Sequence, residues 1–416
     1  MTTLITNISS LVTVNAAGKN FKSGSDMQDI GEIKNGAMIF DRKIKWIGSV
    51  EQVMSSISNS NFTPDNIIDA KGKTVLPGFV DSHTHIVFGG NRSSEFARRL
   101  KGVSYKRIAE EGGGILTTVR GTRDASVHEL VETGKRLAGN AMKNGTTALE
   151  IKSGYGLSLE SEIKLLKSIK ILKSGLPVHI SPTFLGAHDF PPEFRNKHHD
   201  YINLICNDMI PAVVEQGLAE FCDAFIDEGY FTLEEGERVL KAGLENGLKL
   251  KVHCDELAGF GSTNLAAKLG AVSADHLLFV SDDGIAALKK SGTVATLLPG
   301  TAYNIRLPYA PARKLIDRGC IVALATDCNP GSCFTENMQV ILSLAVTNMN
   351  MSAEEAITAA TLNGAAALCQ SEQMGSLEIG KLANFIIADV TSYTDLFYHF
   401  GINHVEQTWV NGSRVI

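Results

Sequence analysis

The sequence predicts an α/β fold: a (β/α)8 TIM-type barrel with a small β-sandwich domain formed by both chain ends. Strand-like and helix-like segments alternate through the middle of the chain, and both ends contain short strand-like segments. The 416 residues also leave room for a barrel of about 250 residues and a smaller unit. We expect the composite sandwich at residues 1–73 and 378–416, and the barrel at 74–377.

Both chain ends are predicted to be β structure without helices. Apolar runs at residues 11–14, 37–40 and 44–47 are separated by clusters of turn-forming residues, and similar runs lie at 383–388 and 407–412. Short isolated hairpins are marginal in water. We therefore expect the two ends to form one sandwich together.

Eight strands are predicted between the ends, at residues 74–81, 146–151, 178–185, 221–226, 248–253, 271–276, 293–297 and 321–327. Helix starts fit between and after them, because Thr232 with Glu235, and Ser352 with Glu355, have the spacing of a capping box. Eight strand–helix units favour a closed barrel, although a doubly wound sheet offers a similar alternation.

A long insertion follows the first predicted barrel strand, at about residues 88–144. Such length at the catalytic end of a barrel is typical of a lid or binding wall. It contains the glycine triplet at 112–114, which follows no strand and lacks the Lys-Ser/Thr ending of a phosphate loop. We do not expect phosphate binding there.

Composition and charge favour a small-molecule substrate. The net charge of −6 and the pI near 6.0 give no basic face for nucleic acid or an anionic membrane. The N-terminus lacks the pattern of a signal peptide, and no stretch approaches the roughly 18 apolar residues of a membrane span. A cytoplasmic protein is expected.

The seven cysteines are predicted to be reduced thiols. Their number is odd, they are scattered, and no C-x-x-C pair occurs, so neither a disulfide framework nor an all-cysteine zinc site is expected. Cys254, Cys328 and Cys333 lie near the candidate catalytic residues, where we expect them to pack as small apolar groups.

Histidines and an aspartate lie at the ends of several predicted strands. His83 and His85 follow the first strand, and residues i and i+2 of an extended chain share one face. Alone, this pair is often structural. His253, His276 and Asp327, however, end the fifth, sixth and eighth strands, and barrel enzymes place their chemistry at that mouth. Imidazoles and a carboxylate suit Zn²⁺ or Fe²⁺ with a position open for water.

This arrangement resembles the amidohydrolase superfamily, whose members carry an H-x-H after strand one, histidines after strands five and six, and an aspartate after strand eight. The resemblance implies one divalent metal, zinc or iron, held by His83, His85, His253 and Asp327. It leaves His276 facing the substrate or supporting the ligands. Two-metal members generally need a carboxylated lysine, often after strand four, and none ends that strand here. Lys152, after strand two, is expected to be structural or substrate-facing instead.

Finer matches lie at residues 89–96, 150–157, 184–188, 253–256 and 325–332. They are similar to superfamily members that hydrolyse the cyclic amide of 4-imidazolone-5-propanoate to N-formimidoyl-L-glutamate in histidine degradation. The resemblance also implies a homodimer. An aromatic ring deaminase of the same superfamily remains the alternative. A non-catalytic scaffold would predict eroded metal positions, and every one is present.

Expected roles follow from the chemistry of each group. Asp327 could accept the proton of the attacking water, His276 could stabilise the oxyanion or shuttle a proton, and Glu256 could bind a ring nitrogen and protonate the leaving nitrogen. Arg92 offers a planar fork for the propanoate carboxylate. Without the resemblance, an arginine in a long loop such as Arg92 would be predicted to be a solvated surface residue. The other expected substrate contacts are Tyr155, His188, Asn329, Gly331 and Ser332.

Overall fold

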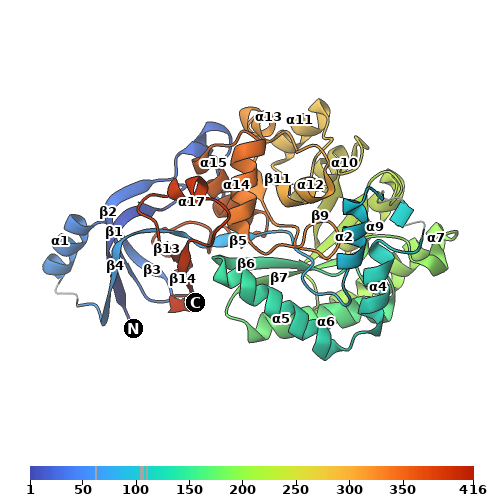
Figure 1. Ribbon diagram of the computed structural model, residues 1–416, viewed down its shortest axis with the longest axis horizontal. Helices are drawn as coiled ribbons and strands as arrows, with labels where there is room; N and C mark the ends of the chain where they lie inside the picture. The colour runs from blue at the N-terminus through green and yellow to red at the C-terminus, as the bar shows by residue number, and fades with distance from the viewer. Residues whose placement is uncertain (61–62, 104–106, 109–110) are drawn as a thin grey trace.

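The computed structural model describes residues 1–60, 63–103, 107–108 and 111–416. Its centre is an eight-stranded parallel sheet in the order β12-β11-β10-β9-β8-β7-β6-β5 (Figure 1). These strands are β5 (Phe79–Asp81), β6 (Thr146–Lys152), β7 (His179–Ala187), β8 (Phe221–Ile226), β9 (Lys249–Cys254), β10 (Ser273–His276), β11 (Val294–Leu297) and β12 (Val322–Leu324).

The sheet closes into a barrel just beyond the ends of its first and last strands. The backbone N–H of His85 donates to the carbonyl of Cys328 at 2.9 Å, and the N–H of Asp327 donates to that of His83 at 3.0 Å. These bonds join the segments that follow β5 and β12. The expected barrel is confirmed, and the closure brings the two ends of the sheet together at the mouth.

Helices surround the barrel strands and connect them (Figure 1). Both predicted capping boxes are present, at Thr232 with Glu235 and at Ser352 with Glu355. These helices are α2 (Ser93–Leu100), α4 (Ile115–Asp124), α5 (Val127–Lys143), α6 (Leu159–Gly175), α7 (His198–Leu204), α8 (Ile210–Glu215), α9 (Leu233–Glu245), α10 (Ser262–Lys268), α11 (Asp282–Ser291), α12 (Pro299–Ile305), α13 (Ala312–Asp317), α14 (Met338–Asn348), α15 (Ala353–Ala360) and α16 (Leu362–Ala366). A further helix, α17 (Asp395–Tyr398), belongs to the C-terminal segment beyond the barrel. Short 3-10 turns, η1 (Gly24–Gln28) and η2 (Pro192–Phe194), and a π-helical turn, η3 (Ile205–Met209), complete them.

The two chain ends build a second sheet beside the barrel, as expected (Figure 1). Its order is β15-β14-β13-β4-β1-β2-β3, comprising β1 (Thr3–Val12), β2 (Glu32–Phe40), β3 (Ile44–Ser49), β4 (Asn66–Pro77), β13 (Phe385–Ala388), β14 (Val405–Val410) and β15 (Ser413–Arg414). The sheet rolls over itself, because Phe40 lies with its ring centroid 5.1 Å from Phe385 and 5.5 Å from Trp409. The single rolled sheet thus supplies both layers around the hydrophobic core of the domain formed by the chain ends.

Two details of the ends differ from expectation. The prediction of no helices there is wrong. The helix α1 (Val50–Ser60) follows β3 and buries Val53 against Leu4 and Ile39. The 3-10 turn η1 lies between β1 and β2, and α17 lies between β13 and β14. The strand expected over 74–81 is divided at Gly78 into β4 of the rolled sheet and β5 of the barrel. A Cβ at Gly78 would lie 2.2 Å from the Thr147 side chain, so only glycine permits the close passage between the two sheets.

The long insertion is largely helical where it is described, as α2, α4 and α5. Residues 104–106 and 109–110 of the insertion lie outside the described residues. All seven cysteines are free thiols, and Cys254, Cys328 and Cys333 are buried. Among the described helices, none combines the length and apolar character needed to cross a bilayer.

Candidate active site

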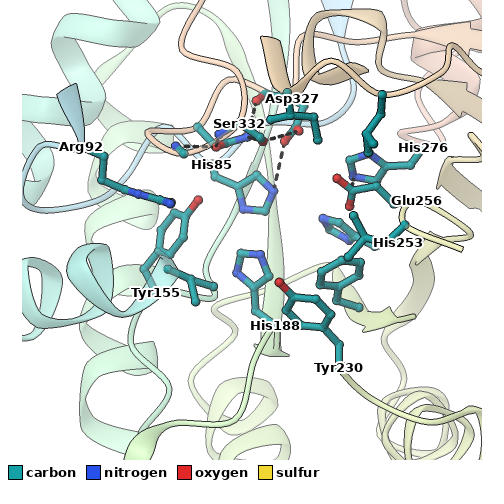
Figure 2. A pocket seen from close by; sticks show the side chains of 17 residues that line it. His85, Arg92, Tyr155, His188, Tyr230, His253, Glu256, His276, Asp327 and Ser332 are labelled. Carbon is teal, nitrogen blue, oxygen red and sulfur yellow. Dashed lines mark hydrogen bonds and ion pairs between the residues drawn. The ribbon is translucent and has the colours of Figure 1, made fainter. Parts of the chain in front are cut away.

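A cavity of about 240 Å³ opens at the C-terminal mouth of the barrel. Figure 2 shows Arg92 and Tyr155 on one side of it and Glu256 and His276 on the other, with His85 between them. The predicted site residues that line it are His85, Arg92, Tyr155, His188, His253, Glu256, His276, Asp327, Asn329, Gly331 and Ser332. His83 lies directly beneath, fully buried.

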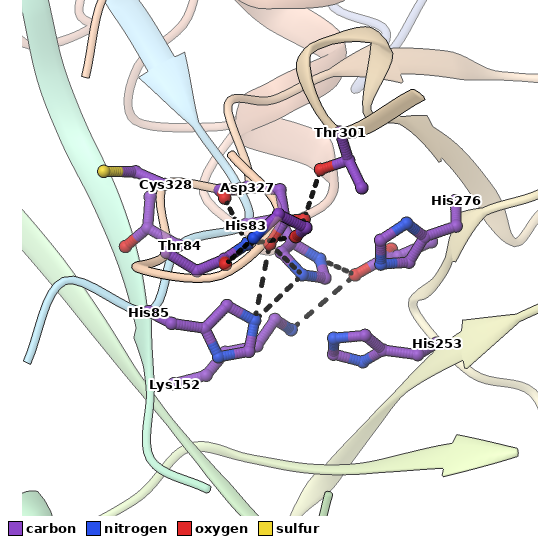
Figure 3. Close-up of polar contacts among 12 residues, drawn as sticks. His83, Thr84, His85, Lys152, His253, His276, Thr301, Asp327 and Cys328 are labelled. Atoms are coloured by element: carbon purple, nitrogen blue, oxygen red, sulfur yellow. Dashed lines mark hydrogen bonds and ion pairs between the residues drawn. The ribbon is translucent and has the colours of Figure 1, made fainter. Parts of the chain in front are cut away.

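The structure brings the four predicted metal ligands together. His83, His85 and His253 each offer a ring nitrogen, and the three nitrogens lie within 4.8 Å of one another. The Nε2 atoms of His83 and His85 are 3.3 Å apart, and Asp327 Oδ1 lies 3.6 Å from both (Figure 3). The ring centroid of His276 is 5.2 Å from that of His253, so His276 borders the cluster.

Two of these side chains depend on left-handed backbone at the strand ends. His276 has φ of +78° and Asp327 has φ of +52°. Asp255, next to the end of β9, has φ of +46°. Residues other than glycine seldom adopt this conformation, and such positions concentrate at functional sites. The turn at each strand end directs the following side chains to the barrel mouth.

Two buried aspartates face the far nitrogens of the ligand histidines. Asp275 Oδ2 is hydrogen-bonded to His83 Nδ1 at 2.6 Å. Asp223 Oδ2 lies 3.0 Å from His253 Nδ1, an ion-pair distance without a hydrogen bond. A carboxylate at Nδ1 fixes the tautomer and leaves the Nε2 lone pair for a metal. Burial lowers the pKa of His83 and His85 well below the usual histidine value, with neighbouring positive groups adding to the effect. Both rings are therefore neutral, as ligands must be.

These residues fit a divalent cation. His85 Nδ1 and His276 Nδ1 are buried atoms for which the described residues supply no hydrogen-bond partner. The Nε2 atoms of His83 and His85 converge with Asp327 Oδ1, and imidazole nitrogens with a carboxylate oxygen form a donor set suited to zinc or iron. The donor set agrees with the divalent metal that the resemblance implies.

Sequence reasoning missed Asp223 and Asp275. Each lies inside a strand that is buried along its whole length. A charged residue in such a run was the available signal, because buried charges are rare unless paired. Their partners, however, depend on the register between strands, which the sequence alone does not give.

Arg92 is held in place by a buried carboxylate. Its Nε donates to Glu95 Oε2 at 2.9 Å, and Glu95 also accepts from Thr117 Oγ1 at 2.7 Å. Only 8% of the Arg92 surface is exposed, so this arginine is not the solvated residue of the alternative interpretation. A Cβ on Gly331 would lie 2.1 Å from Arg92 Nη1. The absence of a side chain at Gly331 therefore allows the Arg92 guanidinium to pack directly against the loop after β12.

His188 and Tyr155 form a second wall of the cavity. The His188 ring stacks on His85 with a centroid separation of 5.2 Å, and its Nδ1 lies 3.0 Å from the carbonyl of Gly154. Burial lowers the pKa of His188 to about 3, so its ring is neutral. The loop that carries Tyr155 is organised by Glu162, whose carboxylate accepts three backbone N–H groups, from Gly154, Gly156 and Leu157. Glu162 was not anticipated.

Glu256 lies opposite Arg92, with Oε2 3.5 Å from His276 Nε2. Its backbone N–H donates to Asp227 Oδ2 at 2.7 Å, which fixes the loop after β9. Burial raises the pKa of the Glu256 carboxyl well above its usual value, and the charges of Asp327 and Asp227 add to this. The environment of Glu256 thus favours a protonated carboxyl that can donate.

The loop after β12 uses Asn329 as its organiser. Asn329 Oδ1 accepts the N–H groups of Gly331 and Ser332, both at 2.8 Å, and its Nδ2 donates to the carbonyl of Asp327 at 2.8 Å. The amide is therefore engaged within the loop. Asn329 shapes the cavity wall, and its contact with a substrate stays a prediction.

The cavity also has an apolar lining that the sequence did not reveal. Its members are Ile115, Phe225, Tyr230, Leu257, Ile305 and Leu307. Most follow strand ends or lie in helices whose position depends on the closed barrel, so no local pattern marks them. They give the site the mixed apolar and polar character of a small-molecule pocket.

A parallel barrel with three imidazoles and a carboxylate at its C-terminal mouth defines a metal-dependent hydrolase. The model of the amidohydrolase family matches residues 74–415, and the chain belongs to this family. It is accordingly a hydrolase of carbon–nitrogen bonds.

Within the family the chain is similar to the imidazolonepropionases over its full length. It is 47% identical to the imidazolonepropionase of Porphyromonas gingivalis over 419 residues, covering 100% of this chain and 97% of that one. The imidazolonepropionase of Clostridium tetani is 46% identical over 413 residues, covering 99% and 97%.

Solved structures with low identity share the fold. Guanine deaminase of E. coli superposes with a TM-score of 0.73 at 16% identity, covering 100% of this chain and 99% of that one. A zinc-bound adenosine deaminase of Xanthomonas campestris has a TM-score of 0.72 at 16% identity, covering 99% and 92%.

Proposed function

We propose that the protein hydrolyses the cyclic amide of 4-imidazolone-5-propanoate to N-formimidoyl-L-glutamate, a step of histidine degradation. The observation that carries this proposal is the layout of the cavity. Arg92 lies on one side, Glu256 and His276 on the other, and the histidine–aspartate cluster between them (Figure 2). A small ring with an anionic tail matches that layout.

Arg92 would bind the propanoate carboxylate through its guanidinium, a bidentate geometry that fixes direction as well as affinity. Tyr155 and His188 would complete the wall that receives the tail. The imidazolone ring would then lie against the apolar lining with its amide carbonyl towards His85 and Asp327. The loop of Asn329, Gly331 and Ser332 would close the cavity behind the tail.

The reaction adds water across the ring amide bond. A divalent cation held by His83, His85, His253 and Asp327 would supply Lewis acidity, which lowers the pKa of bound water and polarises the carbonyl. Asp327 would accept the proton of the attacking water at a carboxylate oxygen. His276 Nε2 would stabilise the oxyanion. Glu256 would deliver a proton to the ring nitrogen as its bond to the carbonyl carbon breaks.

We further propose zinc or iron as the single metal, a homodimer, a cytoplasmic location, no nucleic-acid or membrane partner, and a domain division at residues 1–73 and 378–416 against 74–377. The donor set supports either metal. The net charge of −6 supports a small-molecule partner over nucleic acid.

The function is tested with purified, metal-replete protein and 4-imidazolone-5-propanoate. We expect loss of the imidazolone absorbance and stoichiometric appearance of N-formimidoyl-L-glutamate, with about one zinc or iron per chain by elemental analysis. Activity should disappear on chelation and return with the metal. No turnover of the imidazolone, together with ammonia release from a purine or pyrimidine, would replace this function with that of an aromatic ring deaminase.

Arg92→Ala is expected to raise KM by about 10- to 150-fold, the value of one charge-assisted contact, with metal content unchanged. Gly331→Ala should act in the same direction, because the added Cβ would meet Arg92 Nη1 at 2.1 Å. Arg136→Ala removes an exposed arginine near the same loop and serves as the control. Steady-state kinetics and elemental analysis check these results, and loss of metal from Arg92→Ala would show that Arg92 is misassigned.

A further inference from the structure

Five charged side chains form a buried network inside the barrel, below the histidine cluster. Each side chain has no exposed surface. Burial of so many charges carries a large desolvation cost unless each charge is paired. We therefore ask which contacts offset that cost and what the charges do. Its members, which we name the buried charge network, are Glu150, Lys152, Asp223, Lys251 and Asp275.

Lys152 connects the carboxylates that face the ligand histidines. Its Nζ lies 2.7 Å from Asp223 Oδ2 and 3.6 Å from Asp275 Oδ2. The same two oxygens face His253 Nδ1 and His83 Nδ1. Figure 3 shows the Lys152 side chain running towards the histidine rings. One ammonium group thus contacts both of the carboxylate–histidine pairs.

The network also contains a second grouping of metal-type ligands. His83, Glu150 and Asp275 each offer an atom within 4.8 Å of the others. Lys152 Nζ contacts two members of this grouping, at 2.9 Å from Glu150 Oε1 and 3.6 Å from Asp275 Oδ2. Asp223 Oδ1 and Asp275 Oδ1 are buried and receive no hydrogen bond from the described residues. Each of the two aspartates that contact the ammonium through Oδ2 therefore keeps one oxygen with spare capacity.

The charge balance supports a cation at this place. Three carboxylates face two lysines, so the network carries a formal charge of 2 − 3 = −1. Burial opposes the charge of Lys152, but Asp223, Glu150 and Asp275 raise its pKa above the usual lysine value, so the ammonium is retained. Without it the formal charge becomes −2, which one divalent cation would neutralise.

We propose that the ammonium of Lys152 occupies a second cation position, limits the site to one metal, and holds Asp223 and Asp275 against the two ligand histidines. Lys152 is thereby a positioning residue. The inference rests on the metal site of the proposed function. It gives a physical reason for a single metal that does not depend on the absence of a lysine from β8.

The test is the number of metal ions bound by the full-length protein. Wild-type protein and Lys152→Met are loaded with excess Zn²⁺ and freed of unbound metal on a desalting column. The zinc that remains bound per chain is then measured by elemental mass spectrometry. We expect one Zn²⁺ per wild-type chain and two per Lys152→Met chain. Lys152→Arg keeps the charge and should remain at one. Lys251→Met is the matched control and should remain at one Zn²⁺: it removes an equal charge, which contacts Glu150 and the Ser82 carbonyl, but it leaves the Lys152 ammonium in place beside Asp223 and Asp275.

Cobalt provides a second readout. Titration of the apoprotein with Co²⁺ should give one visible-absorption phase in the wild type and two in Lys152→Met. The first phase of Lys152→Met should have a 10- to 100-fold weaker Co²⁺ affinity than the wild-type phase, as is typical when a contact that supports a metal ligand is lost. Lys152→Gln replaces Lys152→Met if the latter does not fold.

Two ions in the wild type, or one ion in each uncharged variant of Lys152, would overturn the inference. These results are distinguishable from failure of the proposed function. A wild-type chain that binds one metal and hydrolyses the imidazolone keeps the function even if the Lys152 variants also bind one.

Discussion

Asp327→Asn is expected to lower kcat by about 10³- to 10⁴-fold, towards the upper end of the range for loss of a catalytic proton acceptor. Asp327 Oδ1 lies 3.6 Å from both His83 Nε2 and His85 Nε2, and in the proposed mechanism this carboxylate is both a metal ligand and the proton acceptor. An amide is a weaker ligand and cannot accept that proton at neutral pH. Steady-state kinetics with elemental analysis separate the two losses.

A graded variant sharpens this test. Thr301 Oγ1 donates to Asp327 Oδ2 at 2.5 Å, so Thr301→Val removes the support and leaves the carboxylate. We expect a 10- to 100-fold effect on metal affinity or activity. Asp317→Asn makes the same chemical change at the exposed last residue of α13 and should have no effect on kcat or metal content. Near-normal kcat in metal-loaded Asp327→Asn would remove this residue from the proton transfer.

The convergence of the candidate metal ligands was predictable because each lies at a strand end. Strand periodicity places alternate residues on one face, and parallel strands in a barrel end at one mouth. His83, His85, His253, His276 and Asp327 could therefore be expected at one mouth without knowledge of any contact, and the structure brings them together. The choice of four of them as metal ligands, without His276, came from the resemblance to the amidohydrolase superfamily.

The support of those ligands could not be predicted in the same way. Lys152 meets Asp223 from another strand, and Glu162 reaches the Tyr155 loop from a helix. Such partners depend on register and on helix docking, which only the closed barrel determines. The helix α1 escaped notice for a different reason. Its sequence contains several Ser and Asn residues with low helix propensity, and burial of Val53 compensates for them.

Glu256→Gln is expected to lower kcat by about 10²- to 10⁴-fold while KM and metal content change little. Glutamine keeps the shape and the hydrogen-bonding reach of Glu256 but cannot release a proton to the leaving nitrogen. Glu228→Gln is the control, since Glu228 is an exposed carboxylate that follows the end of the neighbouring strand. If both variants keep wild-type kcat, Glu256 is not the proton donor.

The pH profile gives an independent check on the same group. Burial and the nearby carboxylates raise the pKa of Glu256. In the proposed mechanism the protonated form is the donor. Activity attributable to this carboxyl is therefore present below its pKa and lost as pH rises through it. A nucleophilic or basic role would give the opposite slope. The alkaline fall in kcat should be absent from Glu256→Gln, whose remaining activity no longer depends on that proton.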